Sequence, residues 1–66
     1  MDHALESLVF RHLAERGPTT AAELAVAAGL EMATIERIIV TLIGAGLIGV
    51  TGHEPDGTPI FDVFQA

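Results

Sequence analysis

The sequence predicts an α+β fold in which three helices are followed by a two-stranded β-hairpin. Two observations lead to this prediction. Apolar residues recur at helical spacing over the first two thirds of the chain. The last third holds two short β-prone runs separated by a stretch rich in glycine and proline. At 66 residues the chain is near the lower size for a self-sufficient core, so we expect residues 1–66 to form a single domain.

The first helix is expected from about Asp2 to Arg16. Its apolar stripe recurs every three to four residues and is followed by Gly17-Pro18, a pair that ends a helix. The stripe consists of Leu5, Val9, Phe10 and Leu13.

A short second helix is expected over Ala21–Ala28. Thr20 followed at the third residue by Glu23 is a capping box, in which each side chain binds a backbone N–H that the first helical turn leaves unpaired. Gly29 fits the position after the helix, where a left-handed backbone conformation is common.

A third helix is expected after Leu30, running to about Ala45. Gly44 and Gly46 are typical of a helix exit. The apolar stripe of this helix consists of Ile35, Ile38, Ile39 and Leu42.

Two strands complete the expected fold, over Leu47–Thr51 and Ile60–Phe64. Both runs are rich in branched and aromatic residues, and residues 52–59 between them carry turn signals. Pro59 cannot donate a backbone hydrogen bond, so we expect it at the start of its strand or on an edge.

Several segments resemble the winged helix-turn-helix domains of bacterial and archaeal regulators of the MarR, ArsR and IclR types. The resemblance covers almost the whole chain and implies a hairpin wing after the third, recognition helix. The matching segments are Val9–Leu13, Gly17–Ala25, Gly29-Leu30, Thr34–Arg37, Leu42, Gly46–Ile48, Asp56-Gly57 and Ile60–Phe64. At these positions Ala25 is small where two helices approach, Gly29 suits a tight turn, and Ile35 inserts the recognition helix into the core.

The resemblance also implies a DNA-binding surface. In such regulators the exposed side of the recognition helix enters the major groove and the wing tip lies along the backbone. On this chain the corresponding DNA contacts would be Thr34, Arg37 and Thr41. Arg37 is the one cationic residue of that surface. It has two interpretations, a guanine or phosphate contact and an exposed ion pair with Glu36 or a neighbouring acid.

The charge of the chain argues against a nucleic-acid partner. Three arginines, no lysine and nine carboxylates give a net charge of −6. Four of the carboxylates occupy positions where phosphates would lie, and Glu31 stands where the resembling regulators carry a serine or threonine. This acidic contact surface consists of Glu31, Glu36, Glu54 and Asp56. Non-specific affinity for DNA is therefore expected to be weak or absent.

Apolar residues exceed what one small core needs. Those of the third helix cover about 200° of its circumference, more than the ~100° stripe of a helix with one buried side. Some should stay exposed in a monomer, and we expect a protein interface there, with a homodimer as one form. The simpler alternative is that a very small domain leaves some apolar atoms uncovered. The expected interface residues are Met32, Val40, Ile43, Leu8 and Phe10.

No residue pattern predicts catalysis, a cofactor or a metal. Residues 44–49 spell GxGxxG, but a dinucleotide site needs a strand before this motif and a helix after it, and here that order is reversed. His53, Glu54 and Asp56 offer possible metal ligands on a turn without fixed geometry. We expect no enzyme activity, no small-molecule substrate and no membrane span, and we expect a cytoplasmic location.

The sequence therefore leads to two functional hypotheses. The first is an acidic winged-helix module that binds a protein partner or itself and modulates a larger assembly, one form of which is an inhibitor that mimics DNA. The alternative is a DNA-binding transcriptional regulator, as the resemblance by itself implies.

Overall fold

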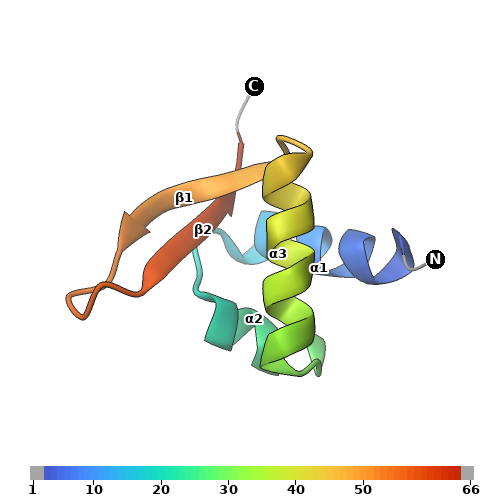
Figure 1. The fold of residues 1–66 in the computed structure, drawn as a ribbon, viewed down its shortest axis with the longest axis horizontal. Coiled ribbons are helices and arrows are strands. Elements are labelled where there is room, and N and C mark those ends of the chain that lie inside the picture. Colours follow the sequence, from blue (N-terminus) through green and yellow to red (C-terminus); the bar gives the residue numbers. More distant parts are fainter. Residues whose placement is uncertain (1–2, 65–66) are drawn as a thin grey trace.

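The computed structural model describes residues 3–64, and within them three helices precede an antiparallel hairpin (Figure 1). The elements are α1 (His3–Arg16), α2 (Ala21–Ala28), α3 (Met32–Gly44), β1 (Ile48–His53) and β2 (Pro59–Val63). This is the predicted order and the predicted fold class. The bounds differ in detail: α3 ends at Gly44 and Ala45 is its C-cap, while the strands lie one or two residues away from their predicted ends. Asp2, the predicted start of the first helix, lies outside the described residues.

Both ends of α2 are fixed by the predicted capping residues. The Glu23 backbone N–H donates to Thr20 Oγ1 at 3.3 Å, and the Thr20 N–H donates to Glu23 Oε1 at 3.5 Å. At the other end Gly29 has a φ of 69°, which places it in the left-handed region that glycine adopts without steric cost. The Leu30 N–H then donates to the Ala25 carbonyl at 3.0 Å, so the chain turns sharply into α3.

The core lies where all five elements meet. Each helix contributes one apolar stripe, as its periodicity predicts, and each strand contributes one buried residue. Its residues are Val9, Leu13, Leu24, Ala25, Ile35, Ile38, Ile39, Leu42, Ile48 and Phe61. Of these, Ala25 allows close approach of α2 and α3, and Ile35 is fully buried, as the resemblance implied. The predicted apolar stripes of α1 and α3 therefore hold the hairpin against the helices.

An isolated bridge joins the hairpin to the segment between α1 and α2. Thr19, in the segment between α1 and α2, forms an isolated antiparallel bridge with Phe61 of β2. The Thr19 N–H donates to the Phe61 carbonyl at 3.0 Å, and the Phe61 N–H donates to the Thr19 carbonyl at 2.7 Å. This link fixes the position of β2 relative to α2 and α3, and the sequence did not predict it.

The tip of the hairpin is held by its own hydrogen bonds. The Thr58 N–H donates to Asp56 Oδ1 at 2.9 Å, and the Glu54 N–H donates to the Thr58 carbonyl at 2.8 Å. Gly57 adopts a φ of 93° at the bend. Pro59 is the first residue of β2, as predicted from its missing N–H. We refer to residues 48–63, the two strands and their tip, as the wing.

Candidate binding face

The helix α3 and the wing enclose a groove on one side of the molecule, which we call the wing groove. Its volume is about 320 Å³. It is lined by Ala21 and Ala22 of α2, by Met32, Glu36, Ile39, Val40 and Ile43 of α3, and by Thr58, Pro59 and Phe61 from the wing. Ile39 and Phe61 are core residues, so the floor of the groove is the core itself.

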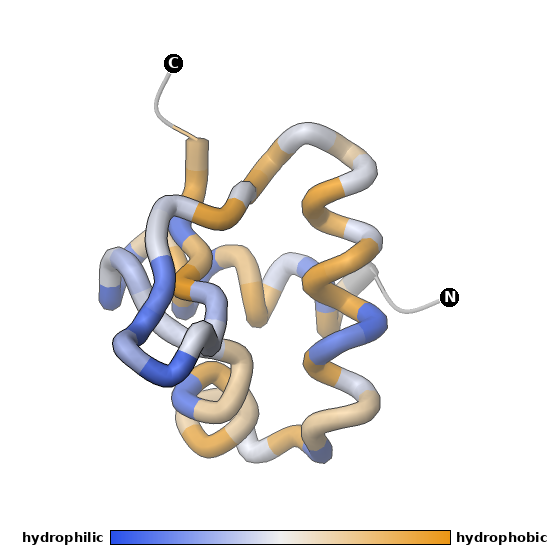
Figure 2. The backbone as a smooth tube through the Cα atoms, turned by 60° about the vertical axis from the view of Figure 1, so that its left-hand side comes forward, coloured by the Kyte–Doolittle hydropathy of each residue, from blue (hydrophilic) through white to orange (hydrophobic). Residues whose placement is uncertain are grey.

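Three of the predicted interface residues lie in this groove with much of their surface in solvent. Val40 is 69% exposed, Met32 42% and Ile43 40%. The predicted exposure of these side chains is confirmed, and their role in an interface stays a prediction. Figure 2 shows hydrophobic positions along much of α3, facing a hairpin whose tip is hydrophilic. An apolar surface of this kind on a small domain is typical of a contact with another macromolecule.

The predicted DNA contacts lie elsewhere on α3. Thr34, Arg37 and Thr41 line a different hollow, of about 270 Å³, together with Leu5, Glu6 and Ile38. This side of α3 faces α1 rather than the wing. The Thr41 hydroxyl donates to the Arg37 carbonyl at 3.0 Å, so its proton is used within the helix. The three residues do lie together, as predicted, but not in the groove that α3 forms with the wing.

Arg37 is exposed, and its guanidinium makes no ion pair with any acid among residues 3–64. The ion pair with Glu36 or a neighbouring acid, one of the two interpretations of Arg37, is therefore not formed among these residues. Glu36 lines the wing groove whereas Arg37 lines the hollow beside α1, so successive residues of the helix diverge.

All four carboxylates of the predicted acidic contact surface are exposed. Glu36 is the charged residue of the wing groove, and Glu31 is the N-cap of α3 without a side-chain capping bond. Glu54 and Asp56 belong to the wing tip, next to the Thr58 and Pro59 wall of the groove. The hydrogen bond with the Thr58 side chain, followed by that with its N–H, lowers the pKa of the Asp56 carboxyl. Asp56 therefore keeps its negative charge at neutral pH.

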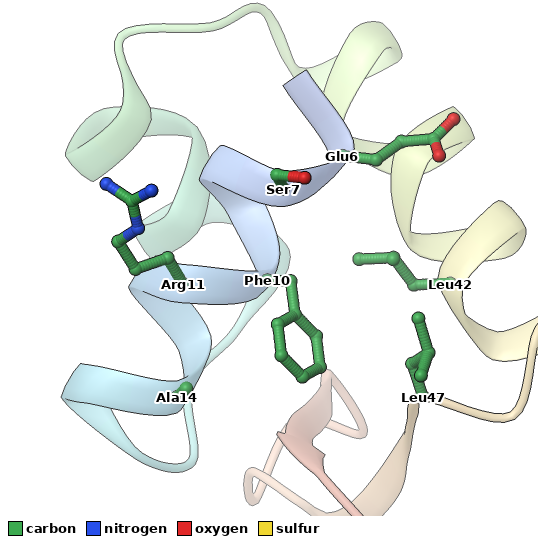
Figure 3. Close-up of a pocket in the computed structure, with 7 residues that line it drawn as sticks. All are labelled: Glu6, Ser7, Phe10, Arg11, Ala14, Leu42 and Leu47. Atoms are coloured by element: carbon green, nitrogen blue, oxygen red, sulfur yellow. The ribbon is translucent and has the colours of Figure 1, made fainter. Parts of the chain in front are cut away.

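Leu8 and Phe10, the predicted interface residues of α1, are less exposed than predicted, and their role in an interface stays a prediction. Both side chains are partly buried, and Phe10 packs against the core. The reason is that Leu42 and Leu47, at the exit of α3, approach the Phe10 ring around a second cavity of about 500 Å³ (Figure 3). We call it the α1 cavity. It is lined by Glu6, Ser7, Phe10, Arg11, Ala14, Leu42 and Leu47.

Four other exposed apolar residues were missed by the sequence analysis. They are Val26 (85% exposed), Phe64 (62%), Val50 (49%) and Leu47 (45%). Val26 could have been found, because it lies about 200° around the helix from the buried Leu24. Phe64 could not, because its position depends on tertiary contact: its ring lies over Gly49, where an added Cβ would come within 2.7 Å of Phe64 Cζ.

Among residues 3–64, no group of three or more histidine, aspartate or glutamate side chains is placed to hold a metal ion. The same residues include no helix that is both long and apolar enough to cross a membrane.

No protein-family model matches the chain, and no curated protein matches it either. Its structure, however, resembles several solved ones. The Zalpha domain of PKZ from Carassius auratus, solved in complex with Z-DNA, superimposes with a TM-score of 0.83 at 21% identity, covering 94% of this chain and 95% of that one. The apo Zalpha domain of zebrafish PKZ gives 0.85 at 21% identity, covering 96% and 95%. A MarR family regulator from Neisseria meningitidis gives 0.79 at 22% identity, covering 92% of this chain and 44% of the regulator.

These likenesses confirm the predicted fold. The chain is a winged helix-turn-helix domain, with α2 and α3 as the helix-turn-helix and the hairpin as the wing. At 21–22% identity the likeness shows the fold alone.

Proposed function

We propose that this domain is a non-catalytic winged-helix module that binds a protein partner through the wing groove. The observation that carries the proposal is the chemistry of the groove. Its large exposed apolar side chains are Met32, Val40 and Ile43, and its charged residue is an exposed carboxylate, Glu36. An apolar surface bordered by acids is suited to a protein and unsuited to a phosphate backbone.

The charges around the groove indicate the class of partner. The groove residue Glu36 and the wing-tip residues Glu54 and Asp56 are exposed carboxylates, in a chain of net charge −6. A cationic surface with apolar side chains would be attracted from a distance and would then bury the apolar residues. Proteins that bind nucleic acids have cationic surfaces. The proposal therefore includes the case in which this domain occupies the nucleic-acid-binding surface of its partner and modulates that partner by mimicking DNA.

Two variants separate the charged contribution from the apolar one. A pull-down from native lysate, with and without nuclease, supplies the partner. Glu36→Lys combined with Asp56→Lys should mainly lower the association rate, and more so at low salt, because both residues are exposed. Ile43→Asp should weaken binding by at least about tenfold, because a carboxylate would be desolvated in the contact.

The matched control for Ile43→Asp is Val26→Asp. Val26 is also an exposed branched residue of a helix, but it lies outside the wing groove. Circular dichroism should show that each variant is folded. The proposal is abandoned if Ile43→Asp binds the partner as tightly as Val26→Asp does and the double lysine variant associates at the rate of the unmodified chain.

A second candidate is a DNA-binding regulator, and the comparisons favour it over the first. One of the similar Zalpha domains was solved with Z-DNA bound, and another similar structure is that of a MarR family regulator. On this chain the contacts would come from Arg37, whose guanidinium is exposed, with Thr34 beside it. A pull-down whose captured partner is lost after nuclease treatment would support this candidate. Tight binding to a duplex held in the Z form would support it as well.

A further inference from the structure

The molecule has a second apolar surface, the α1 cavity, which shares no lining residue with the wing groove. Val40 of α3 lines the wing groove, whereas Leu42 of the same helix lines the α1 cavity. Leu42 points about 100° around the helix from Ile43 of the groove and about 200° from Val40, so the two cavities open on different sides of α3. A ligand in one leaves the other open.

The charges at the two sites differ. In the α1 cavity the charged lining residues are one acid and one base, Glu6 and Arg11, which lie at opposite edges of the opening (Figure 3). In the wing groove the charged lining residue is Glu36. Two copies of a chain with net charge −6 repel each other, and they repel most where acid meets acid. The α1 cavity is the one of these two apolar sites where the local charges balance.

We propose that the α1 cavity binds a second copy of this chain. The same surface of each copy would meet about a two-fold axis, as in most homodimers. Leu47 is 45% exposed at its edge and would be buried, together with the open part of the Phe10 ring. Ser7 and Ala14 of α1 are exposed and small, so the two α1 helices can approach closely.

The contact makes the module bivalent. Because the two cavities share no lining residue, a dimer formed at the α1 cavity leaves the lining of both wing grooves uncovered. A partner with two matching sites would then bind with higher avidity than a single groove gives. The self-association itself does not depend on what occupies the wing groove.

Salt dependence distinguishes the two surfaces. Added salt screens the repulsion between two chains of net charge −6, so the dimer should tighten slightly as salt rises. Binding of a cationic partner at the wing groove should weaken over the same range.

The test is sedimentation equilibrium of three proteins up to high micromolar concentration, at low and at moderate salt. The unmodified chain should dimerise. Ala14→Glu adds a carboxylate inside the α1 cavity and should raise the dimer dissociation constant at least about tenfold. Ala33→Glu is the matched control, because Ala33 is an exposed helical alanine that lines none of the three cavities described above. It adds the same charge and should dimerise nearly as well as the unmodified chain.

Three results would overturn the proposal: a strict monomer for the unmodified chain, equal dissociation constants for the two variants, or a dimer that weakens as salt rises. Circular dichroism should show that Ala14→Glu is folded. If it is not, Leu47→Gln replaces it with the same criteria, because the backbone bonds of Leu47 to Leu42 and Phe64 do not involve its side chain.

Discussion

Affinity for random duplex DNA should be very weak and almost independent of salt, and Arg37→Ala should remove the dependence that remains. The reason is the number of cations available. The chain has three arginines and no lysine, and Arg37 is the cation on the exposed part of α3. Arg11 and Arg16 both belong to α1. One protomer can therefore neutralise about one phosphate at this face.

The magnitude follows from counterion release. Each neutralised phosphate contributes a slope of about −0.9 to the logarithm of the binding constant against the logarithm of salt concentration. One contact predicts a loss of about 3.5-fold between about 50 and 200 mM salt, and a dimer with two contacts a loss of about 12-fold. Proteins with six to ten contacts lose roughly 10³ to 10⁵ over that range.

The assay is fluorescence anisotropy of a labelled random duplex, titrated at several salt concentrations with the unmodified chain and with Arg37→Ala. A second labelled duplex, held in the Z form, tests for recognition of shape. Sub-micromolar binding of random duplex with a slope steeper than about −3 would refute the estimate of one phosphate contact per protomer. It would favour the hypothesis of a DNA-binding regulator. An unchanged slope in Arg37→Ala would show that the remaining contact lies elsewhere.

Three further predictions concern the fold. Ile48→Ala should lower the free energy of unfolding in urea by about 2–5 kcal/mol, a large part of the roughly 3–10 kcal/mol expected for a domain of this size, because Ile48 is fully buried. Val50→Ala, on the same strand but 49% exposed, should cost less than about 1 kcal/mol, and equal losses would mean that the strand register is wrong. Hydrogen bonds from the Thr19 side chain and then the Thr20 backbone lower the pKa of the Glu23 carboxyl. The stabilisation by Glu23 is therefore fully present above the ordinary pKa of 4.5 and is lost as the pH falls through the lowered pKa. The melting temperatures of Glu23→Gln and of the unmodified chain should converge at acid pH, and a constant difference between them would contradict this prediction. Gly29→Ala meets no atom within 4 Å but forces an alanine to a φ of 69°, so calorimetry should show a loss of about 1–2 kcal/mol, and an unchanged melting temperature would exclude the left-handed cap.

Local sequence determined the elements of this domain. The capping box of Thr20 and Glu23 and the glycine at position 29 set the bounds of α2, because these interactions join residues close in sequence. The core stripe of α3 followed from periodicity, because burial selects one side of a helix. The resemblance of the segments then supplied the winged helix-turn-helix arrangement, which the solved structures confirm as the fold.

Tertiary contacts decided which surfaces these elements form. A helical wheel shows that Val40 and Arg37 are exposed, but not that one faces the wing and the other α1, because that depends on where the neighbouring elements pack. The bridge between Thr19 and Phe61 fixes the wing, and through it the wall of the groove, yet it joins residues 42 positions apart that carry no shared local signal. Phe10 was partly covered for the same reason, since Leu47 reaches it only after α3 has ended and the chain has turned back. The exposed positions of α3 could be read from the sequence, whereas which residues share a surface is a property of the packed chain.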